Sequence, residues 1–292
     1  MNIIVGKTAG FCFGVKRAVE GCFNQIESNT VNKQIYCFGE LVHNRQVVNR
    51  LENKGIKFIN NINQVKGDNS SLIIRAHGVP KEEYENAKLK QIKIIDYTCP
   101  YVLKIHNIVE QYKNKGFYIF VVGNKQHPEV IGTISYCGGK YSVIEDEKDI
   151  EYAINSFLKE QNNNLLVIVQ TTFNKEKFGI IENNIRKSMN SNIHIEFKNT
   201  ICSATEERQK ETEKISKEVN LMIIIGGKNS SNTKKLYEIS KNNTKTLLIE
   251  TSEELDIESI KEYDKVGIMA GASTPKESID EVIESLKYKA KQ

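Results

Sequence analysis

Short apolar runs alternate with longer amphipathic stretches along the whole chain. Runs such as "YIFVVG", "LLVIVQ" and "LMIIIG" span a few residues and end at glycine or polar residues, which predicts buried strands. Between the runs, apolar residues recur at helical spacing. In the first such stretch they are Val15, Val19, Cys22, Phe23 and Ile26. Alternating strands and helices predict an α/β fold with parallel sheets and crossover helices.

This alternation occurs three times, in segments that each begin with a cysteine. The cysteines are Cys12 in "TAGFCFGVKRAVEGC", Cys99 in "DYTCPYVLKIHNIVEQY" and Cys202 in "NTICSATEERQKETEKIS". A helical stretch follows each one, although the third stretch is highly charged and its apolar face is unclear. Self-similarity at a fixed period is a property of the whole fold, so the chain is predicted to contain three similar units.

The repeat also closes on itself. The strand "IKIID" precedes Cys99 and "IHIEF" precedes Cys202, whereas the matching strand for Cys12 is "NIIV" at the N-terminus. The third segment lacks a last strand of its own, and residues 2–5 can supply it. We therefore predict α/β units at 6–97, 98–199 and 200–285, the third completed by 2–5, and a C-terminal tail at 286–292. The three units would surround a pseudo-threefold axis.

Polar loops follow two strands of each unit. After the first strand lie His43, His127 and Ser230, which are 31, 28 and 28 residues beyond their cysteines. After a later strand lie His77, Thr171 and Ser273, which are 65, 72 and 71 residues beyond them. The same loops contain Pro80, Pro100, Pro128 and Pro275. Because ligands of parallel sheets bind at the carboxyl ends of strands, we expect these loops to converge on one site.

Three cysteines in matched positions favour a metal centre. Three thiolates suit an iron–sulfur cluster, whose usual set is four, and would leave one iron open to substrate. A three-cysteine zinc site is the metal alternative, and three buried thiols are the structural one. A zinc finger or a thioredoxin-type redox pair is not supported, because both need closely spaced thiols and the sequence contains no CxxC motif. We interpret Cys22, Cys37 and Cys137 as core residues.

The polar loops offer anion-binding chemistry. His43, His77 and His127 can donate hydrogen bonds and, when protonated, add charge. The stretch "GGKNSSN", with Ser230, Ser231 and Asn232, opens a helix whose N-terminus attracts phosphate. Ser273 adds a further hydroxyl, while His106 in a helix and His194 in a strand are interpreted as structural.

Glu129 stands two residues after His127, beside Pro128. A carboxyl group there could deliver protons to a leaving hydroxyl. It could equally be an ordinary acidic residue in the first turn of a helix. The residues alone leave both interpretations open.

Bulk properties restrict the class of protein. The chain has 292 residues and a net charge of +4, too small to indicate a nucleic-acid partner. No apolar run approaches the ~20 residues of a membrane span, and the N-terminus lacks the apolar region of a signal peptide. We therefore expect a cytoplasmic protein with no nucleic-acid or membrane partner.

Nine ordered motifs resemble those of the LytB-type 4-hydroxy-3-methylbut-2-enyl diphosphate reductases. They are "GFCFGVKRAV", "GELVHN", "RAHGVP", "DYTCPYV", "GNKQHPEVIG", "QTTF", "TICSATEERQ", "KNSSNTKKL" and "AGASTP", and they cover essentially the whole chain. The resemblance implies an oxidoreductase for the last step of the non-mevalonate isoprenoid pathway. Two electrons and two protons would remove the hydroxyl of an allylic diphosphate as water, giving isopentenyl and dimethylallyl diphosphates.

The resemblance also implies residue roles. A 4Fe–4S cluster at the centre of the fold would be held by Cys12, Cys99 and Cys202. The diphosphate would be bound by His43, His77, His127, Ser230, Asn232 and Ser273, with Ser231 adjacent. Glu129 would be the proton donor, with His127 beside it in the catalytic set and Thr171 near the substrate hydroxyl. Whether Thr171 or Thr172 points inward stays open.

The implied electron donor is a ferredoxin or flavodoxin. Two other classes compete with the reductase: a non-redox dehydratase that uses the cluster only as a Lewis acid, and a cluster carrier or metal sensor. A carrier has no use for three histidines and a serine-rich loop, so the polar loops favour an enzyme.

Overall fold

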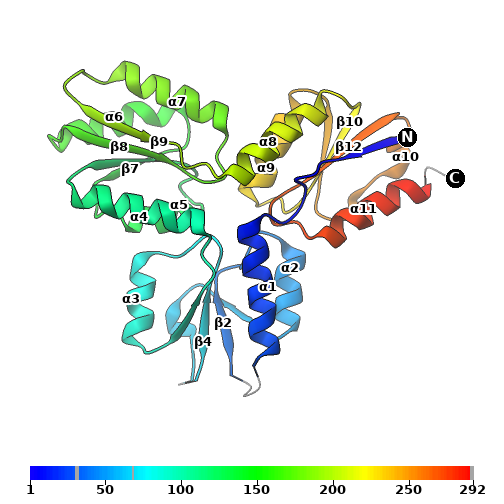
Figure 1. Cartoon of the computed structure of the whole chain (residues 1–292), viewed down its shortest axis with the longest axis horizontal. Helices are drawn as coiled ribbons and strands as arrows, with labels where there is room; N and C mark the ends of the chain where they lie inside the picture. Colours follow the sequence, from blue (N-terminus) through cyan, green and yellow to red (C-terminus); the bar gives the residue numbers. More distant parts are fainter. Residues whose placement is uncertain (30–32, 68, 290–292) are drawn as a thin grey trace. The chain divides into compact units, whose positions relative to one another are not determined.

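The computed structural model describes residues 1–29, 33–67 and 69–289, which form three four-stranded parallel sheets with connecting helices (Figure 1). Each of the apolar runs that the sequence predicts as strands is a strand in the structure. The α/β class with three similar parallel-sheet units is therefore confirmed.

The first sheet has the strand order β3-β2-β4-β5. Its strands are β2 (Ile35–Phe38), β3 (Lys57–Ile59), β4 (Ser71–Ile74) and β5 (Lys93–Asp96). The helices of this part of the chain are α1 (Phe13–Glu27), α2 (Arg45–Asn53), η1 (Ile62–Gln64) and α3 (Lys81–Leu89).

The second sheet has the order β7-β6-β8-β9. Its strands are β6 (Tyr118–Val122), β7 (Tyr141–Ile144), β8 (Asn164–Val169) and β9 (His194–Lys198). The helices are α4 (Pro100–Asn114), α5 (Pro128–Ser135), η2 (Glu147–Asp149), α6 (Ile150–Lys159) and α7 (Lys175–Ser188).

The third sheet has the order β1-β12-β10-β11. Its strands are β1 (Asn2–Val5), β10 (Leu221–Ile225), β11 (Lys245–Ile249) and β12 (Lys265–Ala270). The helices are α8 (Ser203–Ser216), α9 (Ser231–Lys241), η3 (Ser252–Glu254), α10 (Ile257–Ile260) and α11 (Lys276–Lys289). The N-terminal strand is thus the parallel neighbour of β12, with Ile3 opposite Val266.

The three sheets share one strand order, because β1, β5 and β9 occupy the same edge and each leads into a cysteine. Contacts within the chain define two compact units: one comprises Met1–Val19, Val42–Leu51 and Ser203–Gln292, the other Glu20–Leu41 and Glu52–Cys202. The boundaries of three separate units and the pseudo-threefold axis stay predictions. Helix α11 continues to Lys289, so residues 286–289 of the predicted tail are helical, and residues 290–292 lie outside the described residues.

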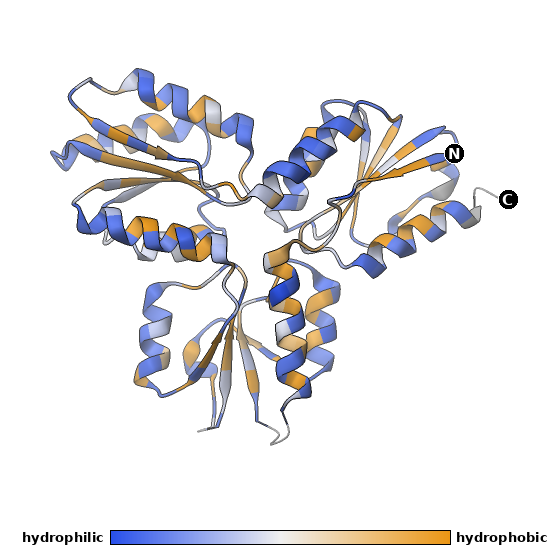
Figure 2. Cartoon of the chain, in the orientation of Figure 1, coloured by the Kyte–Doolittle hydropathy of each residue, from blue (hydrophilic) through white to orange (hydrophobic). Residues whose placement is uncertain are grey.

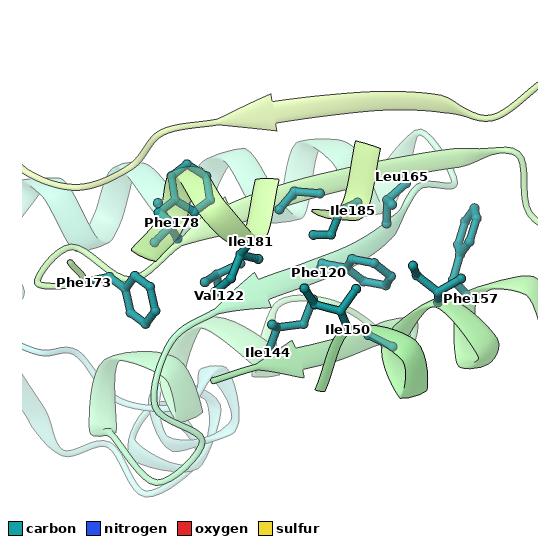
Figure 3. Packing of buried hydrophobic residues seen from close by; sticks show 14 of the residues in the cluster. Phe120, Val122, Ile144, Ile150, Phe157, Leu165, Phe173, Phe178, Ile181 and Ile185 are labelled. Atoms are coloured by element: carbon teal, nitrogen blue, oxygen red, sulfur yellow. The ribbon is translucent and has the colours of Figure 1, made fainter. Parts of the chain in front are cut away.

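The core of each sheet lies on both of its faces, because successive strand residues point to opposite sides. In β6, Phe120 and Val122 pack with α6 and α7 in one cluster (Figure 3). Ile119 and Val121 belong to another cluster. Central strands such as β6 and β10 are buried along their whole length. Their sequences are therefore continuous apolar runs. In Figure 2 these strands are coloured mainly as hydrophobic, whereas the helices carry both hydrophobic and hydrophilic colours.

Among the described residues, none of the helices has both the length and the apolar character that a membrane crossing requires.

The position of β1 at a sheet edge predicts that proline will destabilise the protein more at Ile4 than at the adjacent Val5. The N–H groups of Asn2 and Gly6 donate to Asp264 O (2.7 Å) and Ile268 O (2.9 Å) on the β12 side. By the alternation of a parallel ladder, the N–H of Ile4 also faces β12, whereas that of Val5 faces the open edge. Ile4→Pro should lower the free energy of unfolding by about 1–3 kcal/mol, since it removes a ladder hydrogen bond.

Val5→Pro is the matched control, because Val5 is exposed and its N–H is not needed by the ladder. The loss in free energy of unfolding, measured by urea unfolding followed by circular dichroism, should be clearly smaller for Val5→Pro than for Ile4→Pro. Equal losses for the two variants would contradict the placement of β1.

Candidate active site

The three repeat cysteines all lie at the start of a helix. Cys99 is the N-cap of α4, and Cys12 and Cys202 directly precede α1 and α8. All three are thiols of intermediate burial that form no disulfide. Each thiol therefore lies at the end of a helix where the partial positive charge of the N-terminus is concentrated.

A hydrogen bond from the backbone fixes each of these cysteines in the same way. The cysteine N–H donates to the carbonyl two residues beyond the end of the neighbouring strand, β12, β4 or β8. The pairs are Cys12 N to Ala272 O (3.2 Å), Cys99 N to Ala76 O (2.9 Å) and Cys202 N to Thr171 O (3.1 Å). The sequence repeat thus corresponds to a repeated local structure, and each cysteine is tied to a polar loop.

The other three cysteines belong to the core, as predicted. Cys22, Cys37 and Cys137 are buried. Burial raises the pKa of the Cys22 and Cys137 thiols to about 12, and it raises that of Cys37 as well. These thiols therefore stay protonated and suit packing rather than metal binding.

In the unit that contains the second sheet, two of the predicted histidines lie together. The rings of His77 and His127 meet edge to face, with centroids 5.1 Å apart. His127 is the N-cap of α5, and its Nδ1 accepts a hydrogen bond from the Glu129 N–H (3.2 Å). In the neutral ring Nε2 then carries the proton, which leaves His127 able to donate a hydrogen bond to an anion.

Pro128 is the first residue of α5 and Pro100 the first of α4. The sequence pattern predicts that both prolines lie in loops, whereas in the structure each is the first residue of a helix. The reason is that proline has no N–H to lose at this position, and its φ already suits a helix. This fixed helix start places His127, the N-cap, and Glu129 in the same first turn of α5.

Glu129 is buried, with 1% of its surface exposed, and it contacts Thr171 through both carboxylate oxygens. Thr171 N donates to Oε1 (2.7 Å) and Thr171 Oγ1 donates to Oε2 (2.6 Å). Burial raises the pKa of Glu129 to about 7, although the hydrogen bonds from Thr171 act in the opposite direction. A carboxyl group in this state can hold or release a proton near neutral pH.

The structure also distinguishes the two threonines of "QTTF". Thr171 is buried and bound to Glu129, whereas the Thr172 hydroxyl accepts a hydrogen bond from Gln170 Nε2 (3.1 Å). Gln170 Oε1 in turn accepts from the Asn124 N–H (3.0 Å), so it joins the two polar loops. Gln170 is a residue that the sequence pattern did not single out.

In the unit that contains the third sheet, the loops after β10 and β12 meet His43. Ser273 Oγ donates to the His43 carbonyl (3.0 Å). That carbonyl also lies so close to Gly227 that a Cβ there would approach it to 2.6 Å. Only glycine at position 227 therefore permits this packing.

The start of α9 contains the serine-rich loop. Ser230 is the N-cap, and its Oγ accepts from the Thr233 N–H (3.3 Å). Asn232 is only 3% exposed, yet neither polar atom of its amide has a hydrogen-bond partner within the described part of the chain. Buried polar atoms are nearly always paired, so an unpaired amide beside a helix N-terminus indicates a place for a polar ligand. Ser231 is half-buried at the first position of the helix.

The two remaining histidines lie elsewhere. His106 is buried in α4, where it stacks on Tyr136 with ring centroids 4.4 Å apart. Burial lowers its pKa to about 4, so the ring is neutral. His194 begins β9 on the surface and faces Glu196 (3.5 Å).

These features define an α/β protein of three similar sheet units, with cysteines at three helix starts and polar loops at the carboxyl ends of the strands. Residues 3–287 match the family model described as LytB protein, so the chain belongs to the LytB family, as the sequence motifs predict.

Relatives of the chain include named enzymes. It is 42% identical over 283 residues to the 4-hydroxy-3-methylbut-2-enyl diphosphate reductase of Clostridioides difficile, covering 97% of this chain and 98% of the relative. It is 41% identical over 296 residues to the reductase of the same name from Aquifex aeolicus, covering 100% and 96%.

Solved structures that resemble the chain are also of diphosphate reductases. One, of (E)-4-hydroxy-3-methyl-but-2-enyl diphosphate reductase, the terminal enzyme of the non-mevalonate pathway, matches with a TM-score of 0.71 and 41% identity over 99% of this chain and 100% of its own. Another, of E-1-hydroxy-2-methyl-but-2-enyl-4-diphosphate reductase from Plasmodium falciparum, matches with a TM-score of 0.87 and 30% identity, covering 97% and 87%.

The raised pKa of Glu129 predicts a pH dependence of stability. Between about pH 4.5 and about pH 7 the native carboxyl keeps a proton that the unfolded chain releases, so stability falls as the pH rises through this window. Relative to Glu129→Gln, the free energy of unfolding of the wild type should decrease by about 3 kcal/mol over this range and then level off. Urea unfolding of chelator-treated protein at several pH values measures the difference, and a difference that does not change with pH contradicts the buried carboxyl.

Proposed function

We propose that the chain is a 4-hydroxy-3-methylbut-2-enyl diphosphate reductase. The observation that carries the proposal is a continuous hydrogen-bonded path from a helix-start cysteine to a buried acid. Cys202 N–H donates to the Thr171 carbonyl, and Thr171 N–H and O–H both donate to Glu129. The path joins a possible metal ligand to a carboxyl group whose pKa is raised to about 7. The names of the relatives identify the reaction that such a pair would serve.

In the proposed reaction the C–O bond of the substrate's hydroxyl-bearing carbon breaks. Two electrons and two protons enter, one molecule of water leaves, and the allylic group becomes isopentenyl or dimethylallyl diphosphate. A bound 4Fe–4S cluster supplies the electrons and a Lewis-acidic iron. Everything else in the reaction is binding, orientation and proton delivery by side chains.

Cys12, Cys99 and Cys202 would hold this cluster. Their support is the donor set itself: three thiols that form no disulfide, each at a helix start, and each with its N–H hydrogen-bonded to the adjacent polar loop. The three core cysteines differ from them, because burial raises the pKa of each thiol and so keeps it protonated.

Glu129 would be the proton donor. Its protonated form is populated near pH 7, and the burial that raises its pKa also excludes water that could compete for the proton. Thr171 would orient the carboxyl through its two hydrogen bonds and would itself lie near the substrate hydroxyl. His127 would assist, since its Nδ1 accepts from the Glu129 N–H and so holds the first turn of α5.

The diphosphate would be bound by side chains of the polar loops. His77 and His127, whose rings contact each other, would supply ring N–H donors. His43, Ser230, Asn232 and Ser273 would supply the others, with Ser231 adjacent. The buried, unpaired amide of Asn232 supports this assignment, since a phosphate oxygen would complete its hydrogen bonding.

Electrons would come from a ferredoxin or flavodoxin. A cytoplasmic setting suits the proposal because it keeps thiols reduced, and none of the six cysteines forms a disulfide.

The proposal is tested by anaerobic turnover. Protein purified without oxygen is mixed with the allylic alcohol diphosphate and chemically reduced viologen, and the products and viologen oxidation are followed together. The expected result is two electrons consumed per diphosphate converted, with isopentenyl and dimethylallyl diphosphates as products. Conversion that consumes no reductant would instead identify a dehydratase, and a colourless, zinc-containing protein would contradict the cluster.

Replacement of each cysteine by serine should separate ligands from core residues. Cys12→Ser, Cys99→Ser and Cys202→Ser should each remove most of the bound iron. Cys22→Ser, Cys37→Ser and Cys137→Ser are the matched controls and should leave the iron content near that of the wild type. Iron and sulfide analysis of anaerobically purified protein provides the measurement; loss of the cluster in one of the control variants would show that the ligand set is wrong.

Two variants in the "HPE" turn should separate proton delivery from binding. Glu129→Gln keeps the size of the side chain but removes the acid, so the turnover number should fall by about 10²–10⁴ while iron content is retained. His127→Ala removes a proposed phosphate partner, so KM should rise as kcat falls. Steady-state kinetics of both variants decide, and near wild-type turnover by Glu129→Gln would mean that Glu129 is only a helix-start residue.

A further inference from the structure

Helix α8 has a polar buried face, which is unusual for a helix that packs on a sheet. Its buried residues are Thr205, Arg208, Gln209, Thr212, Ile215 and Ser216. This pattern explains why the sequence of α8 shows no clear apolar face. The buried polar groups need hydrogen-bond partners. Thr212 Oγ1 donates to Arg208 O within the helix and Ser216 Oγ accepts from Asn243 Nδ2, whereas Arg208 contacts the loop at residues 7–10.

Arg208 contacts the carbonyl oxygens of this loop. Its side chain is 3% exposed, and Nε and Nη2 donate to Thr8 O at 2.9 and 2.6 Å. Nη2 also donates to Gly10 O at 2.9 Å. A guanidinium group is rarely this deeply buried, and the carbonyl oxygens compensate for the water it has lost.

Glu211, one helical turn further along, contacts the N–H side of the same loop. Its Oε1 accepts from the Lys7 N–H (2.8 Å), and its Oε2 accepts from the Thr8 N–H (2.8 Å) and the Thr8 hydroxyl (2.6 Å). Partial burial acts to raise the pKa of Glu211, but the hydrogen bonds from Thr8 and Lys7 outweigh it and the pKa is lowered. The carboxyl is therefore ionised, and its hydrogen bonds are charge-assisted.

The other two cysteine loops are fixed differently. Residues 97–98 separate β5 from Cys99, and the Thr98 N–H donates to Asp96 Oδ1 (2.8 Å). Residues 199–201 separate β9 from Cys202, and the Ile201 N–H donates to Asn199 Oδ1 (3.1 Å). In both loops an Asx side chain three residues before the cysteine forms a local turn.

The loop before Cys12 cannot use this device. It is longer, covering residues 6–11, and the residue three positions before the cysteine is Ala9, which has no side-chain acceptor. The Gly10 carbonyl is buried and the Thr8 backbone groups are partly buried, so they need hydrogen-bond partners from elsewhere. Arg208 and Glu211 supply those partners from a helix that is distant in the sequence but belongs to the same unit.

We propose that Arg208 and Glu211, the α8 clamp, are positioning residues that hold the loop at 7–10 so that Cys12 is presented as a cluster ligand. The proposal rests on the proposed function in one respect, which is that Cys12 binds the cluster. The clamp itself acts on the protein whether or not metal is present, so the two can be tested separately.

The first arm of the test is hydrogen exchange, measured by mass spectrometry on the full-length, chelator-treated chain. In Glu211→Gln the amides of Lys7 and Thr8 lose a charged acceptor, and they should exchange about tenfold faster than in the wild type. Glu207→Gln is the matched control, because Glu207 is an exposed carboxylate on the same helix. Neither variant should change exchange in the peptide that contains Asp96 to Cys99.

The second arm measures how tightly the cluster is retained. Glu211→Gln and Arg208→Met should lose their visible absorption to a chelator about tenfold faster than the wild type, as expected when one ligand is held less firmly. Lys210→Met, at an exposed position, should behave as the wild type. If Arg208→Met does not fold, Arg208→Lys replaces it, since lysine keeps the charge but cannot serve both carbonyls.

The proposal requires both arms to respond. Unchanged exchange at residues 7 and 8 would contradict the clamp, and faster exchange with unchanged cluster retention would contradict its role for Cys12. A wild-type protein that holds no iron would contradict the proposed function, while the exchange comparison would still decide whether the clamp orders the loop.

Discussion

The parallel pairing of an edge strand with its neighbour is the constraint on which the site depends. β1, β5 and β9 each pair with the strand that carries a polar loop, and each is followed, after a loop, by one of the repeat cysteines. The pairing continues past the strand ends as a hydrogen bond from the cysteine N–H to the neighbouring loop. Because a change of register would move every one of these groups, the sheet pairing determines where the thiols and the polar side chains lie.

This constraint also explains the electrostatics of Glu129. Thr171 lies just beyond the end of β8, where its carbonyl accepts from the Cys202 N–H while its own N–H and hydroxyl donate to Glu129. A carboxyl group without these donors would be costly to bury. With them the carboxyl is held in a buried position, and this burial raises its pKa to about 7. Strand pairing, thiol position and acid strength are thus properties of one connected structure.

Most of the fold could be predicted from the sequence because its strands are short, apolar and evenly spaced. The repeat placed "NIIV" next to the last strand of the chain, and β1 pairs with β12. The core assignment of Cys22, Cys37 and Cys137 was also accessible, since they fall outside the repeat position. Family membership followed from nine motifs that span the chain.

Other features depend on contacts that a linear pattern does not contain. Thr171 and Thr172 are neighbours with the same side chain, and only the packing against α5 distinguishes them. Helix α8 was unclear because part of its buried polar face contacts the backbone of residues 7–10, which is about two hundred positions away in the sequence. The buried amide of Asn232 has no sequence signal either, because its significance lies in the partner that it lacks among the described residues.

We propose that three cysteines in matched positions hold a four-iron cluster with one iron free of protein thiolate. The Mössbauer spectrum of ⁵⁷Fe-enriched, anaerobically purified protein tests it most directly, because three protein ligands cannot make four iron atoms equivalent. We expect one iron site in four to be distinct from the rest and to change when the allylic diphosphate is added. Four equivalent sites that do not respond to the diphosphate would contradict the account.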